Sequence, residues 1–141
     1  MKKLFISFAL VFLCMCGLVG CAASYDSNSM KSGLERRGYT VQVNATITGL
    51  DTSKMEGYKS NLYAYKEVDG EERGILILIF DSTDHANKEG STSGSTASET
   101  MILMHDWGRK HAPDSDSAVY GTANNIIWAG CQDAKNAAGI E

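Results

Sequence analysis

Cysteine and proline are both scarce in this 141-residue sequence, which holds four cysteines and one proline. Three of the cysteines, Cys14, Cys16 and Cys21, lie within or directly after an apolar N-terminal segment. Cys131 is the only cysteine in the rest of the chain, so an internal disulfide framework is excluded there. The 121 residues that follow the first 20 are enough for one domain that folds on a hydrophobic core alone.

Positive charge is also in short supply, since 13 Lys and Arg residues stand against 17 Asp and Glu residues. Without Lys2 and Lys3 the balance is 11 against 17, a net charge of −6. An acidic surface repels phosphate groups, so the composition argues against binding to nucleic acid or to anionic lipid headgroups. The histidines lack the spacing of a metal site, and the chain has no Ser-His-Asp order or paired-carboxylate motif. We therefore expect no metal, no cofactor and no enzymatic activity.

The N-terminal segment has the layout of a secretory signal peptide. It starts with two lysines and continues as an apolar run from Leu4 to Leu18, interrupted only by Ser7 and Gly17. A basic start, a short apolar core and small residues at the end are typical of such a peptide. The run is shorter than the roughly 20 apolar residues that a membrane-spanning helix needs.

The run ends in Leu18-Val19-Gly20-Cys21, which resembles the lipobox of bacterial lipoproteins at all four positions. The resemblance implies that a dedicated peptidase recognises Leu18, Val19 and Gly20 and cuts before Cys21, whose sulfur carries a diacylglyceryl group. Two or three acyl chains anchor a protein firmly. It further implies an extracytoplasmic protein anchored to the bacterial cell membrane, or to the outer membrane in a Gram-negative host, because Ala22 is not the retention signal Asp. An ordinary signal peptide is the alternative.

The predicted organisation has three parts. Residues 1–20 are the lipoprotein signal peptide, residues 21–30 the lipidated N-terminus with a short tether, and residues 31–141 a single domain. Alternating apolar and polar residues predict a strand over residues 39–48. Asp69-Gly70 predicts a hairpin turn between residues 61–68 and 74–80. The second of these runs is apolar at every position from 75 to 80, which indicates a central strand covered on both faces.

Helices are expected between and after these strands, with a second hairpin near the C-terminus. The expected helix starts and stops are a cap at Asp26, Ser27 or Ser29 with a stop at Gly38, a cap at Asp81, a capping box of Thr96 and Glu99 with a stop at Pro113, and a helix over residues 132–138. The second hairpin turns at Asn124-Asn125 and precedes the last helix, which suggests a ββα repeat. The predicted fold is α+β, a single antiparallel sheet of about five strands with helices packed on one face.

The helix, the strand beginning Gly38-Tyr39-Thr40-Val41 and the strand-turn-helix order are similar to those of small hypothetical lipoproteins of Gram-positive gut bacteria. That group has no established activity, so the resemblance implies no site residues.

Two features of the domain are candidates for function. Tyr63 and Tyr65 fall on one face of their predicted strand, where exposed tyrosines could bind a glycan, a peptide or a protein. The alternative is that they are half-buried residues favoured by β-propensity. Cys131 stands at a predicted helix start, which is a setting for reactive thiols. The alternative is a small, partly buried residue in a tight turn after Gly130.

These observations predict a non-enzymatic envelope lipoprotein that binds a ligand or partner across the sheet face bearing Tyr63 and Tyr65. Its expected partners are the membrane, through the lipid on Cys21, and an envelope protein or a glycan. One alternative is a thiol-dependent surface enzyme or redox protein that uses Cys131. Another is a structural component of the envelope.

Overall fold

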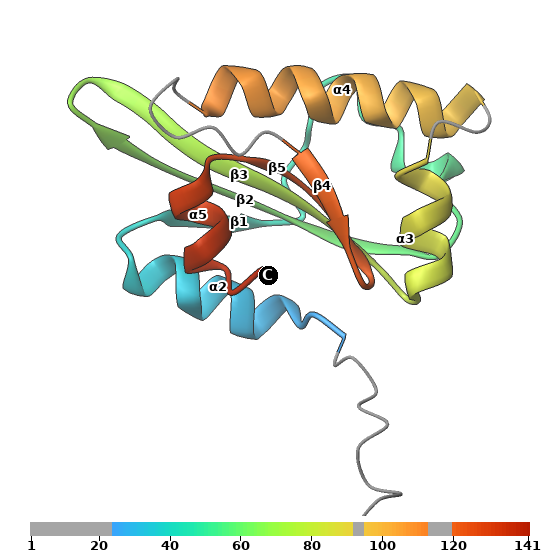
Figure 1. Cartoon of the computed structure of the whole chain (residues 1–141), viewed down its shortest axis with the longest axis horizontal. Coiled ribbons are helices and arrows are strands. Elements are labelled where there is room, and N and C mark those ends of the chain that lie inside the picture. Colours follow the sequence, from blue (N-terminus) through green and yellow to red (C-terminus); the bar gives the residue numbers. More distant parts are fainter. Residues whose placement is uncertain (1–23, 92–94, 113–119) are drawn as a thin grey trace, which may run out of the picture.

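The computed structural model describes residues 24–91, 95–112 and 120–141, with the side chains of residues 95–98 left out. One five-stranded sheet forms the centre, with the strand order β1-β2-β3-β5-β4 and antiparallel pairing throughout (Figure 1). The elements are α2 (Ser27–Arg36), β1 (Thr40–Val43), the 3-10 helix η2 (Thr52–Lys54), β2 (Tyr58–Val68), β3 (Glu71–Phe80), α3 (Thr83–Glu89), α4 (Ser95–His111), β4 (Tyr120–Ala123), β5 (Ile126–Gly130) and α5 (Gln132–Ala137). The predicted α+β class and single antiparallel sheet are confirmed. No helix in these residues has both the length and the apolar character needed to cross a membrane.

The helices cover both faces of the sheet rather than the single face expected (Figure 1). The side chains of Ile75, Ile77 and Ile79 join one core cluster, together with residues of α2 and α5. Leu76, Leu78 and Phe80 point to the opposite face and join a second cluster, together with residues of α3 and α4. A central strand that is apolar at every position exposes apolar side chains on both faces, so each face needs its own cover.

The predicted hairpin joins β2 to β3 and turns at Asp69 and Gly70. Both turn residues have positive φ angles, 55° and 81°. Two consecutive residues in this conformation form the turn whose twist matches that of the flanking strands, so the prediction is confirmed. The hairpin runs from the Val68–Glu71 pair to the Tyr58–Phe80 pair and supplies the longest ladder of the sheet.

Strand β1 is shorter than the alternation over residues 39–48 predicts. It ends at Val43 because Asn44 adopts a positive φ of 54° and turns the chain out of the sheet. The amide of Asn61 then binds both main-chain groups of Ala45: Oδ1 accepts from the nitrogen at 2.9 Å and Nδ2 donates to the oxygen at 3.1 Å. These bonds replace the strand pairing that β1 would otherwise continue.

The N-terminal helix starts earlier than the predicted domain boundary at residue 31. Asp26 is its N-cap, with a side chain that accepts from the amide of Ser29 at 2.9 Å, and Gly38 follows its end with a φ of 82°. The main-chain amide of Tyr25 also donates to Oδ1 of Asn125 at 2.7 Å. Residues 25–30, which were assigned to the tether, are therefore part of the folded domain.

One helix cap and the packing of the repeat differ from the predictions. Ser82, not Asp81, is the N-cap of α3, since its Oγ accepts from the amide of His85 at 3.2 Å. The order ββα occurs twice, as β2-β3-α3 and β4-β5-α5, but α3 and α5 lie on opposite faces of the sheet. The two units therefore do not pack alike. The Thr96 side chain and Pro113 lie outside the described residues.

Candidate binding surface

An aromatic cluster joins β2 to α4 on one face of the sheet. Tyr63 and Tyr65 stack with their ring centroids 5.2 Å apart, and Trp107 of α4 meets Tyr63 edge to face at 5.5 Å. His111 stacks on Trp107 at 3.8 Å. The sequence predicts that the sheet face bearing the two tyrosines is open. In the structure this face is not open, because α4 covers it. Both tyrosines are half-buried, which matches the alternative interpretation of them.

Gly74 makes room for this packing. It pairs with Tyr65 across the hairpin, and a Cβ at this position would lie 2.8 Å from the oxygen of Ala64 and 3.4 Å from Cη2 of Trp107. Because Gly74 has no side chain, the indole of Trp107 can lie close to the backbone of β3.

Glu72 ties the cluster together at its outer edge. Its Oε1 accepts a hydrogen bond from the hydroxyl of Tyr63 at 3.2 Å and lies 3.1 Å from Nε2 of His111. Nδ1 of His111 lies 2.9 Å from the main-chain oxygen of Trp107. Burial and the neighbouring Glu72 carboxylate raise the pKa of Tyr63 to about 12, so this hydroxyl stays protonated as a donor at neutral pH.

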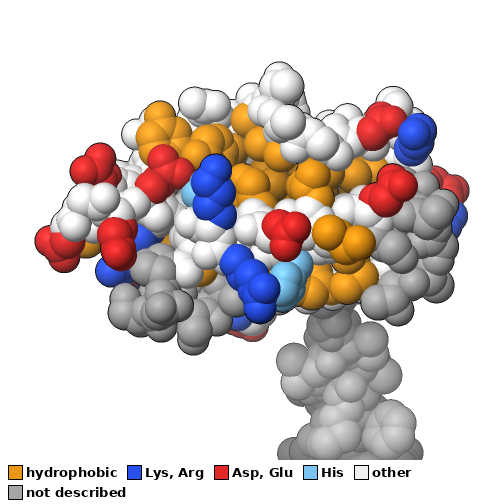
Figure 2. Space-filling model, turned by 90° about the horizontal axis from the view of Figure 1, so that it is seen from above, with side chains coloured by type: hydrophobic (Ala, Val, Ile, Leu, Met, Phe, Trp, Pro, Cys, Tyr) orange, Lys and Arg blue, Asp and Glu red, His pale blue; other side chains and the backbone are white. Residues whose placement is uncertain are grey.

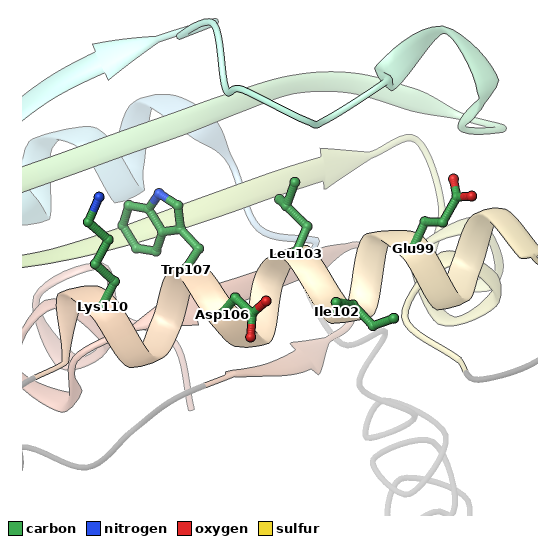
Figure 3. A pocket seen from close by; sticks show the side chains of 6 residues that line it. All are labelled: Glu99, Ile102, Leu103, Asp106, Trp107 and Lys110. Atoms are coloured by element: carbon green, nitrogen blue, oxygen red, sulfur yellow. The ribbon is translucent and has the colours of Figure 1, made fainter.

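An apolar groove runs along the outer side of α4 next to this cluster. We call it the α4 groove; it has a volume of about 480 Å³, and its lining residues are Glu99, Ile102, Leu103, Asp106, Trp107 and Lys110 (Figure 3). Ile102 is 63% exposed, the most exposed large apolar side chain among the described residues. Viewed from above, apolar side chains form a band across this face with acidic and basic side chains beside it (Figure 2). No pattern in the sequence predicts this surface.

The Cys131 thiol is sealed in the opposite face of the sheet. Cys131 is fully buried, and the hydroxyl of Tyr39 lies 3.6 Å from its Sγ. That hydroxyl donates to Oδ2 of Asp133 at 2.7 Å, and Nζ of Lys66 lies 2.7 Å from the same oxygen. Burial and this hydrogen bond raise the pKa of Tyr39, while Lys66 and then Tyr39 lower the pKa of Asp133. The arrangement matches the buried alternative for Cys131.

The sheet also separates Cys131 from His111, which with His105 is one of two histidines that could serve it as a base. Cys131 belongs to the core cluster under α2 and α5. His111 packs on Trp107 and Tyr63, which belong to the cluster under α4. A thiol on one face and an imidazole on the other cannot form a nucleophile–base pair.

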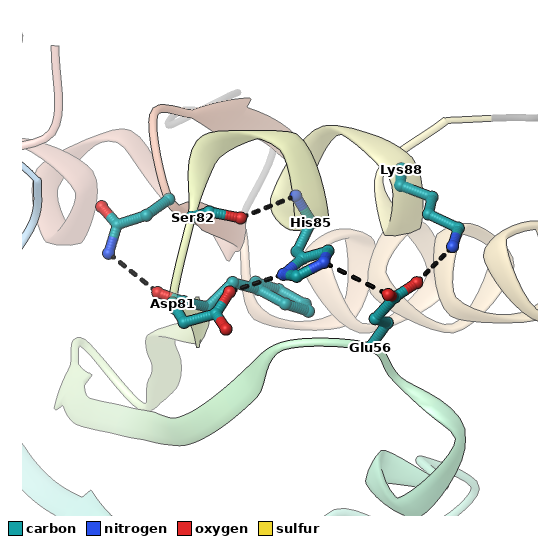
Figure 4. Close-up of polar contacts among 7 residues, drawn as sticks. Glu56, Asp81, Ser82, His85 and Lys88 are labelled. Atoms are coloured by element: carbon teal, nitrogen blue, oxygen red, sulfur yellow. Dashed lines mark hydrogen bonds and ion pairs between the residues drawn. The ribbon is translucent and has the colours of Figure 1, made fainter.

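A network around His85 joins α3 to the chain before β2 (Figure 4). This network was not predicted from the sequence. Nδ1 of His85 lies 2.5 Å from Oδ1 of Asp81, and Nε2 lies 3.4 Å from Oε1 of Glu56. Lys88 pairs with the other oxygen of Glu56. The hydrogen bond to Asp81 raises the pKa of His85, and the pKa values of Asp81 and Glu56 are lowered by His85 and Lys88 respectively. The i, i+4 spacing of Asp81 and His85 was the available signal.

The tight contact between this network and the chain depends on a glycine. Gly57 has a φ of 72°, and a Cβ there would lie 2.2 Å from Nδ1 of His85 and 2.4 Å from Oδ1 of Asp81. The two side chains therefore pack directly over the backbone at the start of β2. The network links the chain before β2 to the first turns of α3.

Within the described ranges, no group of three or more His, Cys, Asp or Glu side chains is placed to hold a metal ion. The lipobox residues Leu18, Val19, Gly20 and Cys21 lie outside those ranges. No protein-family model, no curated protein and no solved structure matches this chain.

Proposed function

We propose that this protein is a bacterial envelope lipoprotein whose domain binds a protein partner through the α4 groove, without catalysis. The anchor is carried by the lipobox, which ends in Cys21. The binding role is carried by one observation, the exposed apolar stripe of Ile102 with Leu103 and Trp107 beside it. A contiguous apolar patch flanked by charged residues is the usual composition of a protein-binding surface.

The position of Ser24, the first residue that the structure describes, supports this use of the groove. Ser24 lines a hollow together with residues of α2. Helix α2 lies on the face of the sheet opposite α4 (Figure 1). Three residue steps separate Ser24 from Cys21, and they span at most about 11 Å. An anchor this short holds the α2 side next to the lipid. The α4 groove then faces away from the membrane, where a partner can reach it.

A thiol-dependent enzyme has less support. Alkylation, oxidation and acyl transfer all require that a reagent reach Sγ, and Cys131 has no exposed surface. The sheet also keeps His111 away from it. We therefore do not propose the enzymatic role, and no cofactor enters the proposal.

The anchor is tested by replacing Cys21 with serine. We expect the variant protein to leave the membrane fraction of the expressing bacterium and to lose its acyl groups by mass spectrometry. The Cys131→Ala variant is the matched control, since it also removes one thiol but should remain in the membrane. Retention of the Cys21→Ser protein in the membrane would contradict the lipoprotein assignment.

The binding role is tested by placing a photo-crosslinking residue at position 102 in the anchored protein. We expect illumination of intact cells to give discrete protein adducts. The control places the same residue at Lys54, which is exposed and lies in η2 outside the groove. Equal labelling at both positions would show that the groove has no specific protein partner.

A further inference from the structure

We propose that the occupant of the α4 groove is a second copy of the same chain, with the two α4 helices packed antiparallel about a two-fold axis. This inference rests on the proposed function only in that both use the α4 groove. It names the partner that the groove takes.

The lining residues form one continuous stripe on α4. They recur every three or four residues, at 99, 102, 103, 106, 107 and 110, so they fall on the same side of the helix. The opposite side of α4 is already occupied, since Thr100, Met104 and His111 are buried against the rest of the domain. The stripe is therefore the face of α4 that is left to a partner.

The stripe is complementary to itself when it is reversed. Its centre lies midway between residues 104 and 105, and the lining residues stand at equal distances on either side of that point. In an antiparallel pair with this centre, three pairs of residues stand at the same level along the helices: Glu99 with Lys110 of the other copy, Ile102 with Trp107, and Leu103 with Asp106. The symmetry repeats these contacts, so the interface has two opposite-charge pairs at its ends, Ile102 and Trp107 inside them, and Leu103 beside Asp106 on either side of the centre.

A parallel arrangement lacks this complementarity. It would place Glu99 against Glu99, Asp106 against Asp106 and Lys110 against Lys110, and like charges across an interface are destabilising. Neither Glu99 nor Lys110 has an ion pair with another of the residues that the structure describes. Within the part of the chain that the structure describes, both side chains are thus available to pair between copies.

The predicted interface is small, because it involves one side of a 17-residue helix. Stable dimers in solution bury about 1,200–2,000 Å² in total, so this contact alone gives weak association.

Charge reversal tests the register. The full-length acylated protein is purified in detergent, and its self-association is measured by sedimentation equilibrium. Glu99→Lys and Lys110→Glu each turn both end contacts into like-charge contacts, and each should raise the dimer dissociation constant by about tenfold. The double variant carrying both reversals restores opposite charges and should return the constant to within about twofold of the unmodified protein. Lys54→Glu is the control for net charge.

Cysteine pairing tests the orientation. Protein with Glu99→Cys is mixed with protein carrying Lys110→Cys and oxidised in detergent, and the antiparallel contact should give a covalent heterodimer. Glu99→Cys alone should stay monomeric, because two copies of this residue would stand about 16 Å apart along the helices, beyond the reach of a disulfide. Circular dichroism of each variant verifies that it is folded.

Three results would overturn the inference. These are a protein that remains monomeric at millimolar concentration in detergent, a dimer that is unaffected by either single charge reversal, and efficient disulfide formation by Glu99→Cys alone. A monomer that still gives adducts with another protein at position 102 would leave the proposed function standing and replace only the second copy as partner. Absence of acyl groups on Cys21 would remove the anchor and leave the dimer test unaffected.

Discussion

His111 and Glu72 meet between the last turn of α4 and strand β3, with Nε2 and Oε1 3.1 Å apart. The imidazole is almost fully buried, whereas the carboxylate is 48% exposed. A half-exposed partner weakens the attraction, since water screens the charge. The packing of Trp107 and Met104 on the sheet, rather than this pair, therefore holds the helix in place.

We expect Trp107→Ala to lower the free energy of unfolding by about 2 kcal/mol. The indole is partly buried against Tyr63 and Gly74, so the loss should be smaller than the roughly 3–5 kcal/mol of a fully buried aromatic residue. Ile102→Ala is the matched control on the same helix, and its exposed side chain should contribute less than about 0.5 kcal/mol. Urea unfolding followed by circular dichroism measures both. Equal losses would show that Trp107 does not anchor α4.

We expect Gly33→Ala to destabilise the contact between α2 and α5 by more than about 1 kcal/mol. A Cβ at this position would lie 2.2 Å from the main-chain oxygen of Ala137, so one helix must move. Alanine is otherwise the better helix former, and on an exposed site it would stabilise the helix. Ser32→Ala, one residue earlier on the exposed side, should change the unfolding midpoint little. A stabilised Gly33→Ala protein would mean that the two helices are farther apart.

We expect the His85 network to make stability depend on pH. The hydrogen bond to Asp81 raises the pKa of His85 in the folded state above its ordinary value of 6.5, so its stabilising contribution is fully present below that pH and is lost as the pH rises through the folded value. The pKa values of Asp81 and Glu56 are lowered, so their contribution is present above about pH 4 and is lost on acidification.

The measurement compares urea unfolding of the unmodified protein and of His85→Gln at pH 6 and pH 8. The unmodified protein should lose stability between these values, while His85→Gln should lose less, because glutamine has no proton to release. His105→Gln controls for a histidine outside the network. If both variants keep the full pH dependence, the network does not contribute to it.

We expect the Cys131 thiol to resist iodoacetamide in the folded protein. Alkylation requires exposure of Sγ, so it should proceed only through the small population of molecules in which the domain is open, and it should become fast in denaturant. Mass spectrometry of the modified peptide follows the reaction. Rapid alkylation under native conditions would reopen the enzymatic alternative.

The elements with strong local signals could be predicted from the sequence. Asp69 and Gly70 readily adopt the positive φ angles that a tight hairpin turn requires. The run from 75 to 80 has no polar residue that could face water, so it must be buried on both faces. These signals are encoded in neighbouring residues. The end of β1 is not, because it depends on the Asn61 side chain, which lies 16 residues from the Ala45 it binds.

The binding surface could not be predicted for a related reason. Tyr63 and Tyr65 were found from their spacing on a strand, but spacing does not reveal that Trp107 covers them. The placement of α4 over β2 depends on Gly74 and on the second core cluster, which form only when distant segments meet. The burial of Cys131 has the same origin, since Tyr39 lies 92 residues away in the chain.

The sheet ends in two short strands, β1 and β4, each of four residues. An edge this short offers few unpaired amide and carbonyl groups to another chain. In the proposed anchored state, copies meet at high local density on the membrane, where long open edges would join main chain to main chain and aggregate. Short edges let such crowded molecules meet through side chains instead, in contacts that can form and separate.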